Sequence, residues 1–285
     1  MSRLSKREVK EQRDLYNLIF TGLTACTQWE RDERIEKIYE NFHPSLIDNQ
    51  TENGAFYSPY GLAQDVAVFS NRSGHIIDVC AGIGMLAYRL KEMDTYNQQI
   101  KSITCIELNE KAVEIGKKLL PEANWICGNV FDEKLWNDLV KDLPNKRFDF
   151  MVSNPPFGKD MNKRKADWLK MTTERDLMVL ELCLKYAKGG YFIMPKGSSS
   201  FNYSGERYFK EDPTRWSRKF QRFMNLTKGH YTFNLSCDGI DSSIYSDEWK
   251  GLNSMTVEAM DVQIYPYSLD YEQDALHNRF KEHIK

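Results

Sequence analysis

Short apolar runs and longer amphipathic stretches alternate through the middle of the chain. The apolar runs predict strands at 75–80, 103–107, 124–127, 147–153 and 191–194. Apolar residues three and four positions apart predict the intervening helices, at 85–92, 109–119, 133–140 and 177–186. Strands that alternate with helices in this way are typical of a doubly wound α/β sheet. Lys188, Gly189 and Gly190 are expected to turn the chain before the strand at 191–194.

Two later segments complete the predicted sheet. Residues 230–237 and 256–265 alternate apolar and polar positions, as strands do when one face is covered. We expect them to form an antiparallel pair that brings the sheet to seven strands. A helix is also expected near 216–224, within a polar and otherwise irregular segment.

The first part of the chain has a different pattern. Residues from about 5 to 43 show helical spacing, with Leu15, Ile19 and Leu23 on one stripe. Such a stripe faces a core more often than it faces a partner. We therefore predict an N-terminal helical extension, residues 1–53, packed on a Rossmann-like α/β domain, residues 54–285.

Composition is that of a soluble globular protein. The formal net charge is −2 over 285 residues, and no apolar run approaches the roughly 20 residues that span a bilayer. The charged start of the chain lacks the apolar region of a signal peptide, so a cytoplasmic location is expected. There is no Cys-x-x-Cys and no zinc-like spacing, so we expect no metal site. Cys80, Cys105 and Cys127 are expected to be small buried residues within strands.

The most informative stretch is Asn154-Pro155-Pro156-Phe157, at the end of the strand at 147–153. The two prolines have no N–H to donate and stiffen the backbone. The amide oxygen of Asn154 and the carbonyl of Pro155 would then form a pair of acceptors. Such a pair suits an –NH2 group on a planar system, and Phe157 offers a face on which that system can stack.

Three further strand ends predict a cofactor site at the same edge of the sheet. Gly82 and Gly84 follow the first strand, Glu107 ends the second, and Asn129 follows the third. Glu107 is placed to bind a ribose hydroxyl pair, and Asn129 an exocyclic amine. These features describe a nucleoside.

The turn after the first strand narrows the choice of nucleoside. It lacks the third glycine of the NAD fingerprint. Asp78 precedes its glycines, where it would repel a pyrophosphate but attract an ammonium group. A nucleoside joined to an amino acid is S-adenosylmethionine.

With these motifs in place, residues from about 54 to 265 resemble the S-adenosylmethionine-dependent amino-group methyltransferases, most of all the gamma-type N6-adenine DNA methyltransferases. Phe56-Tyr57-Ser58-Pro59 is similar to their opening element, which contacts the methionine carboxylate, and Ser58 is expected to cap a helix that begins at Pro59. Asp78 to Gly84, Glu107 and Asn154 to Phe157 resemble the other motifs, in the same order. The chain departs from the family at Asn129, where Asp is common, and lacks a full-sized target-recognition domain.

The resemblance implies a set of site residues. The catalytic residues would be Asn154, Pro155, Pro156 and Phe157. The cofactor-binding residues would be Tyr57, Ser58, Pro59, Asp78, Cys80, Ala81, Gly82, Gly84, Glu107, Leu108, Asn129, Val130 and Phe131. The cofactor would be S-adenosylmethionine, the substrate DNA, and a restriction–modification system the expected setting.

Basic residues cluster after the catalytic motif, in two segments that we expect to bind substrate, 158–176 and 196–228. The predicted contacts are Lys159, Lys163, Arg164, Lys165, Arg215, Arg218 and Arg222. A basic band beside an acceptor site suits a phosphate backbone. Two alternatives stay open, a methyltransferase for RNA adenine or for a protein glutamine amide, and a catalytically idle nucleic-acid-binding subunit. The intact Asp78, Gly82, Glu107 and Asn154 favour an enzyme.

Overall fold

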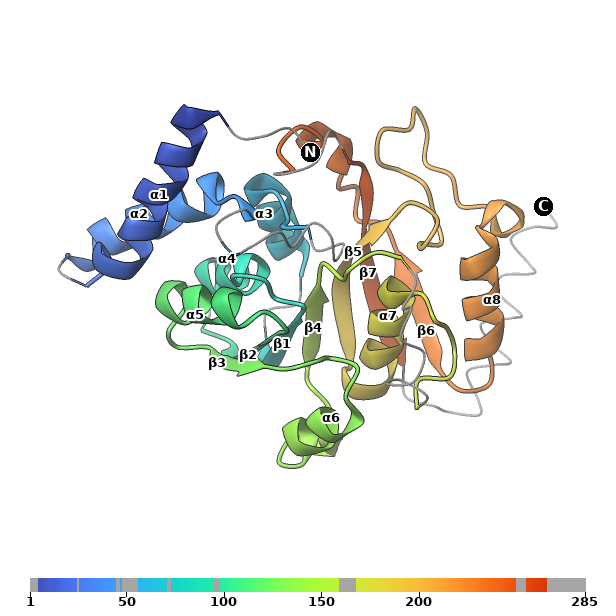
Figure 1. The fold of residues 1–285 in the computed structure, drawn as a ribbon. Helices are drawn as coiled ribbons and strands as arrows, with labels where there is room; N and C mark the ends of the chain where they lie inside the picture. The colour runs from blue at the N-terminus through green and yellow to red at the C-terminus, as the bar shows by residue number, and fades with distance from the viewer. Residues whose placement is uncertain are drawn as a thin grey trace.

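A computed structural model describes residues 5–24, 26–44, 47, 56–70, 73–94, 98–158, 168–249 and 255–265. Within these residues, seven strands form one sheet in the order β3-β2-β1-β4-β5-β7-β6 (Figure 1). The strands are β1 Gly74–Val79, β2 Ile100–Glu107, β3 Asn124–Cys127, β4 Phe150–Ser153, β5 Gly189–Pro195, β6 Thr232–Ser236 and β7 Val257–Tyr265. The first five run parallel, and β7 lies antiparallel between β5 and β6. The predicted doubly wound seven-stranded sheet is confirmed.

Helices cover both faces of the sheet, and the alternation of strand residues explains how. Ile76 of β1 packs in one core with the helices that begin at Tyr60, Met85 and Glu110, whereas its neighbour Ile77 packs in a second core with the helices that begin at Glu133, Arg175 and Arg218. Successive strand residues point to opposite faces, so a continuous apolar run serves two cores. The helices are α3 Tyr60–Phe69, α4 Met85–Met93, α5 Glu110–Leu119, α6 Glu133–Val140, α7 Arg175–Tyr186 and α8 Arg218–Thr227, with short 3₁₀ turns η3 Pro144–Lys146, η4 Pro213–Arg215 and η5 Ser242–Tyr245.

The N-terminal helices pack on the core beside α3 and α5. These are α1 Lys6–Thr21 and α2 Gln28–Asn41, each begun by a capping box, Ser5 with Glu8 and Thr27 with Glu30. Their buried apolar residues belong to the same cluster as those of α3, α4 and α5. The extension therefore shares the core of the sheet. A domain boundary near residue 53 lies outside the described residues and stays a prediction.

Two local predictions were wrong. Gly189 and Gly190 do not turn the chain but begin β5, where they pair with Gln263 and Val262 of β7. A Cβ at Gly190 would lie 2.5 Å from the carbonyl oxygen of Met151, so the missing side chain allows β4 and β5 to pair closely. The strand predicted at 147–153 begins only at Phe150, because Asp149 turns its carboxylate to the backbone N–H of His75 and to Lys188.

The cysteines also differ from expectation at two positions. Cys105 is buried within β2 as predicted, but Cys127 is exposed because β3 is the edge strand of the sheet. Cys80 lies just past β1 with a φ of 63°, in the left-handed region, and not within the strand.

Candidate active site

The carboxyl ends of β1, β2 and β4 and the loop after β3 surround a cavity of about 580 Å³. This is where doubly wound sheets bind ligands, and the volume is typical of a small-molecule site. The residues that line it are Phe56, Tyr57, Ser58, Asp78, Cys80, Ala81, Gly82, Met85, Leu86, Glu107, Leu108, Asn109, Gly128, Asn129, Val130, Phe131, Asn154, Pro156 and Arg175. Most of the predicted cofactor residues and part of the predicted catalytic motif thus share one cavity.

Asn154 enters the cavity with its side-chain amide held in one orientation. Its Nδ2 donates to the carbonyl oxygen of Phe56 at 2.7 Å and to Oγ of Ser58 at 3.1 Å. Both amide hydrogens therefore have acceptors. Its Oδ1 is buried and has no hydrogen-bond partner among the described residues. A buried acceptor without a donor is costly, so this oxygen is suited to a donor that a ligand brings.

Of the other three residues of the tetrapeptide 154–157, one lines the cavity and two pack against the protein. Pro156 lines the cavity, whereas Pro155 is buried and does not. Phe157 is half-buried and packs against Phe56, with ring centroids 6.0 Å apart. It does not line the cavity in this conformation. Its role as a stacking platform stays a prediction.

The glycine-rich turn between β1 and α4 is shaped by the protein's own aromatic rings. Gly82 and Gly84 have φ values of 59° and 90°, which favour glycine. A Cβ at Gly82 would lie 2.6 Å from the ring of Tyr57, and one at Gly84 would lie 2.9 Å from the ring of Trp125. Gly82 lines the cavity, but Gly84 does not. The left-handed backbone and the packing against Trp125 therefore explain why Gly84 lacks a side chain, without a contact to a ligand.

Glu107 ties the glycine turn to the end of β2. Its Oε2 accepts from the backbone N–H of Gly82 at 2.9 Å, and its Oε1 accepts from that of Asn109 at 2.8 Å. Burial raises the pKa of this carboxyl, and the two backbone donors act against that rise. Each oxygen keeps a lone pair for a further donor, so the side chain fits the predicted ribose hydroxyls.

Asp78 is a fully buried carboxyl of the site. Only 1% of its surface is exposed, and its Oδ2 accepts from the N–H of Ala87 at 3.1 Å. Its Oδ1 has no hydrogen-bond partner within the part of the chain that is described. Burial raises the pKa of this carboxyl to about 8. A cationic ligand would restore its charge, which fits a sulfonium bearing an ammonium group.

The far wall of the cavity is the loop after β3. Val130 and Phe131 are nearly buried and form an apolar surface there. The Oδ1 of Asn129 accepts from the N–H of Phe131 at 3.0 Å, which leaves its NH2 group for a ligand. An adenine ring nitrogen is an acceptor for such a donor. The Oδ1 also keeps a second lone pair, so the expected contact with an exocyclic amine stays a prediction.

The opening element differs from its prediction. Helix α3 begins at Tyr60 with Pro59 as its N-cap, and no side chain caps it. Ser58 is 7% exposed and binds Asn154 instead. The prediction that Ser58 caps the helix was wrong because its partner lies far along the chain. Pro59 lines a second cavity and not the first.

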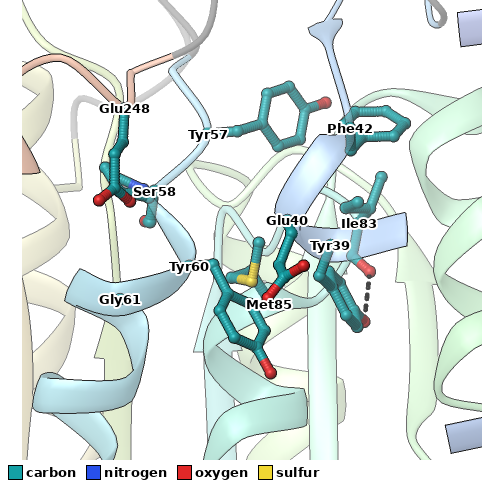
Figure 2. A pocket seen from close by; sticks show the side chains of 11 residues that line it. Tyr39, Glu40, Phe42, Tyr57, Ser58, Tyr60, Gly61, Ile83, Met85 and Glu248 are labelled. Carbon is teal, nitrogen blue, oxygen red and sulfur yellow. Dashed lines mark hydrogen bonds between the residues drawn. The ribbon is translucent and has the colours of Figure 1, made fainter. Parts of the chain in front are cut away.

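That second cavity, of about 380 Å³, adjoins the first through Tyr57, Ser58 and Met85 (Figure 2). Residues of the N-terminal extension, Tyr39 and Phe42 among them, form one wall of it.

The predicted substrate residues that the structure describes do not line the cavity. Lys159, Lys163, Arg164 and Lys165 lie outside the described residues. Arg215, Arg218 and Arg222 are exposed on and just before α8, on the far side of β6 from β1 in Figure 1, and none lines the cavity. Their role stays a prediction.

Sequence reasoning missed six lining residues, Phe56, Met85, Leu86, Asn109, Gly128 and Arg175. Most of them stand next to a predicted residue, and adjacency to the motifs was the available signal. Arg175 lies within the predicted basic segment 158–176 but was not among its predicted contacts. It begins α7, and its backbone N–H donates to the carbonyl oxygen of Gly158 at 2.9 Å.

Two kinds of feature are absent from the described part of the chain. No group of three or more His, Cys, Asp or Glu residues there could hold a metal ion. No helix among the described residues is long and apolar enough to cross a membrane.

Comparisons with known proteins bear on the segment that carries the cavity. Residues 62–176 match the family model of the methyltransferase small domain. Two solved structures share the fold. The methyltransferase subunit of a type I restriction–modification system from Streptococcus thermophilus superposes with a TM-score of 0.51 at 12% identity, covering 86% of this chain and 51% of that chain. The type IIG restriction endonuclease BpuSI gives a TM-score of 0.50 at 14% identity, covering 82% of this chain and 28% of that chain.

A curated relative, cobyric acid synthase of Prochlorococcus marinus, is 26% identical over 156 residues, which is 52% of this chain and 30% of that protein. The chain thus spans less than a third of that relative, so its activity does not transfer. Residues 62–176 thus match a methyltransferase small domain, and S-adenosylmethionine is the cofactor that the cavity fits.

Proposed function

We propose that this protein transfers a methyl group from S-adenosylmethionine to the N6 amino group of adenine in DNA. The observation that carries the proposal is the amide of Asn154. Its two hydrogens are bound to Phe56 and Ser58, and its Oδ1 is buried, without a partner among the described residues and beside the cavity. An acceptor held in this way selects a substrate that brings an N–H donor.

Methyl transfer requires mainly that the methyl donor and the amino acceptor are correctly positioned. Bound S-adenosylmethionine supplies an electrophilic methyl group on its sulfonium. Transfer would form a nitrogen–carbon bond as the carbon–sulfur bond breaks, S-adenosylhomocysteine would leave, and the methylated nitrogen would lose a proton to solvent. The Oδ1 of Asn154 holds one N–H, turns the lone pair toward the methyl group and stabilises the positive charge that develops. Buried surroundings strengthen this contribution.

Two features support a nucleic-acid substrate. Arg175, a cationic residue, lines the cavity that Asn154 and Pro156 also line. Exposed arginines of the segment 196–228 add positive charge outside the cavity. Guanidinium groups bind phosphates well, so a flipped nucleotide could be held through its backbone. The two restriction–modification proteins described above share only the fold, and a modification role in such a system is part of this proposal.

RNA adenine and a glutamine amide also present an –NH2 on a planar group, so the acceptor must be tested directly. The protein is incubated with methyl-labelled S-adenosylmethionine and unmethylated duplex DNA, single-stranded DNA, RNA or denatured protein. Each product is hydrolysed to nucleosides or amino acids. We expect N6-methyl-2′-deoxyadenosine from DNA. Label found only in RNA or in methylglutamine would overturn the proposed substrate, and no label in any arm would favour the idle binding subunit.

A further inference from the structure

The N-terminal extension reaches the glycine-rich turn through one side chain. Tyr39 of α2 is 3% exposed, and its Oη lies 3.2 Å from the carbonyl oxygen of Ile83 and 3.4 Å from that of Gly84. Figure 2 shows the hydroxyl beside Ile83, with the shorter bond drawn as a dashed line. Its ring packs on that of Tyr88 of α4, with centroids 4.7 Å apart. The contact therefore joins α2 to the turn and to the helix that follows it.

Few other hydrogen bonds fix the glycine-rich turn on the side that faces α2. The N–H of Gly82 donates to Glu107, and the N–H of Gly84 donates to the carbonyl oxygen of Ala81 at 2.8 Å. The carbonyl of Gly84 also accepts from Tyr88 N–H at 2.9 Å, whereas no group other than Tyr39 donates to the carbonyl of Ile83 among the described residues. Glycine loses much conformational freedom when it is ordered, so each such bond matters for the shape of the turn.

A second contact extends the same support to Tyr57. Phe42, just after α2, meets the ring of Tyr57 edge-on, with centroids 5.4 Å apart. The Tyr57 ring in turn covers Gly82 so closely that a Cβ there would lie 2.6 Å away. Tyr57 lines both cavities. Tyr39 of α2 thus binds the carbonyl groups of the turn. Phe42, just after α2, contacts the Tyr57 ring that covers Gly82.

We propose that Tyr39 is a positioning residue for S-adenosylmethionine, and that the N-terminal extension is part of the cofactor site. Tyr39 does not line the main cavity. It acts through the carbonyls of Ile83 and Gly84, which fix the turn that presents Ala81 and Gly82 to the ligand. The proposal rests on the cofactor assignment and not on the identity of the methyl acceptor.

The test is calorimetric titration of the full-length protein with S-adenosylmethionine and with S-adenosylhomocysteine. Tyr39→Phe removes only the hydroxyl. We expect it to raise Kd for both ligands by roughly 5- to 30-fold, as the loss of a buried hydrogen bond allows. Tyr88→Phe is the matched control, because its hydroxyl donates to Glu92 at 2.8 Å and not to the turn. It should leave Kd within about twofold, even where both variants lower the Tm equally.

A kinetic readout separates positioning from a general loss of structure. With any acceptor that the wild-type protein methylates, Tyr39→Phe should raise KM for S-adenosylmethionine and leave kcat nearly unchanged. Unchanged Kd in Tyr39→Phe would overturn the proposal. So would an equal rise in Tyr88→Phe, or a wild-type protein that binds neither ligand. Tight binding without methylation of DNA would leave this proposal standing and count against the proposed acceptor.

Discussion

The side-chain NH2 of Asn154 donates to the hydroxyl oxygen of Ser58 at 3.1 Å, across 96 residues of chain. This bond joins the predicted catalytic motif at the end of β4 to the predicted cofactor element before α3. A second bond from the same nitrogen to Phe56 strengthens the connection. The orientation of the Asn154 amide is therefore set by a segment that also lines the main cavity, so the two predicted halves of the site are directly connected.

Asn154→Ala should nearly abolish methyl transfer and leave cofactor binding intact. The amide oxygen serves the acceptor, and removing a hydrogen bond of this type typically lowers kcat by about 10²–10³. Single-turnover kinetics measure the rate, and calorimetry measures Kd for S-adenosylmethionine. An equal loss of cofactor affinity would mean that the positions of donor and acceptor have been interchanged.

Ser58→Ala should have a smaller effect on the same step. It removes one of the two acceptors that orient the amide and leaves the carbonyl of Phe56 in place. A neutral hydrogen bond contributes about 1 kcal/mol, so we expect kcat to fall by roughly fivefold. Ser70→Ala is a suitable control, since that serine is also buried but bonds only within the end of α3. A loss as large as that of Asn154→Ala would show that Ser58 has a direct role.

Cofactor affinity should rise with pH up to about 8 and then level off. The pKa of Asp78 is raised to about 8 by burial, so the carboxyl is mostly protonated below that pH in the free protein. A cationic ligand favours the charged form, so binding releases a proton and strengthens by up to tenfold per pH unit. Titration calorimetry in buffers of different ionisation enthalpy counts that proton. Asp78→Asn should bind more weakly, with the pH dependence flattened.

The same carboxyl makes a prediction for stability. Between the ordinary pKa of Asp, 3.8, and its folded value of about 8, the folded state holds a proton that the unfolded state has lost. Stability of the free protein should therefore fall as pH rises through this window, by at most about 1.4 kcal/mol per unit from this group. Chemical denaturation of wild type and Asp78→Asn at several pH values measures the difference. A wild-type slope no steeper than that of the variant would contradict the folded pKa.

Local pattern predicted the sheet well and the side-chain pairing poorly. The apolar run at Ile76 and Ile77 identifies a strand because two faces must be covered, and this holds whatever lies on each face. Ser58 was expected to cap a helix because local spacing favours that role. Its partner Asn154 is brought to it only by the fold. The roles of Arg175 and Tyr39 are likewise set by distant neighbours, which periodicity cannot identify.

Removing the charges of Arg215, Arg218 and Arg222 together should weaken binding to all DNA sequences alike. These residues are exposed on and next to α8, and none of them lines the cavity. We therefore expect their side chains to contact DNA phosphates and not base edges. Phosphate contacts position DNA without specifying its sequence. For every phosphate that an arginine no longer neutralises, the slope of log K against log salt should fall by about 0.9. Fluorescence anisotropy across a salt series measures this slope.

The matched control for this triple variant neutralises Lys6, Lys10 and Arg13, which are exposed on α1 at the opposite end of the molecule in Figure 1. It should leave both affinity and slope nearly unchanged. Because the three arginines near α8 are expected to contribute no base readout, methylation in an unmethylated host should follow a short or relaxed target sequence. A strict recognition sequence of about six base pairs that disappears in the triple variant would instead make this segment a reader of bases.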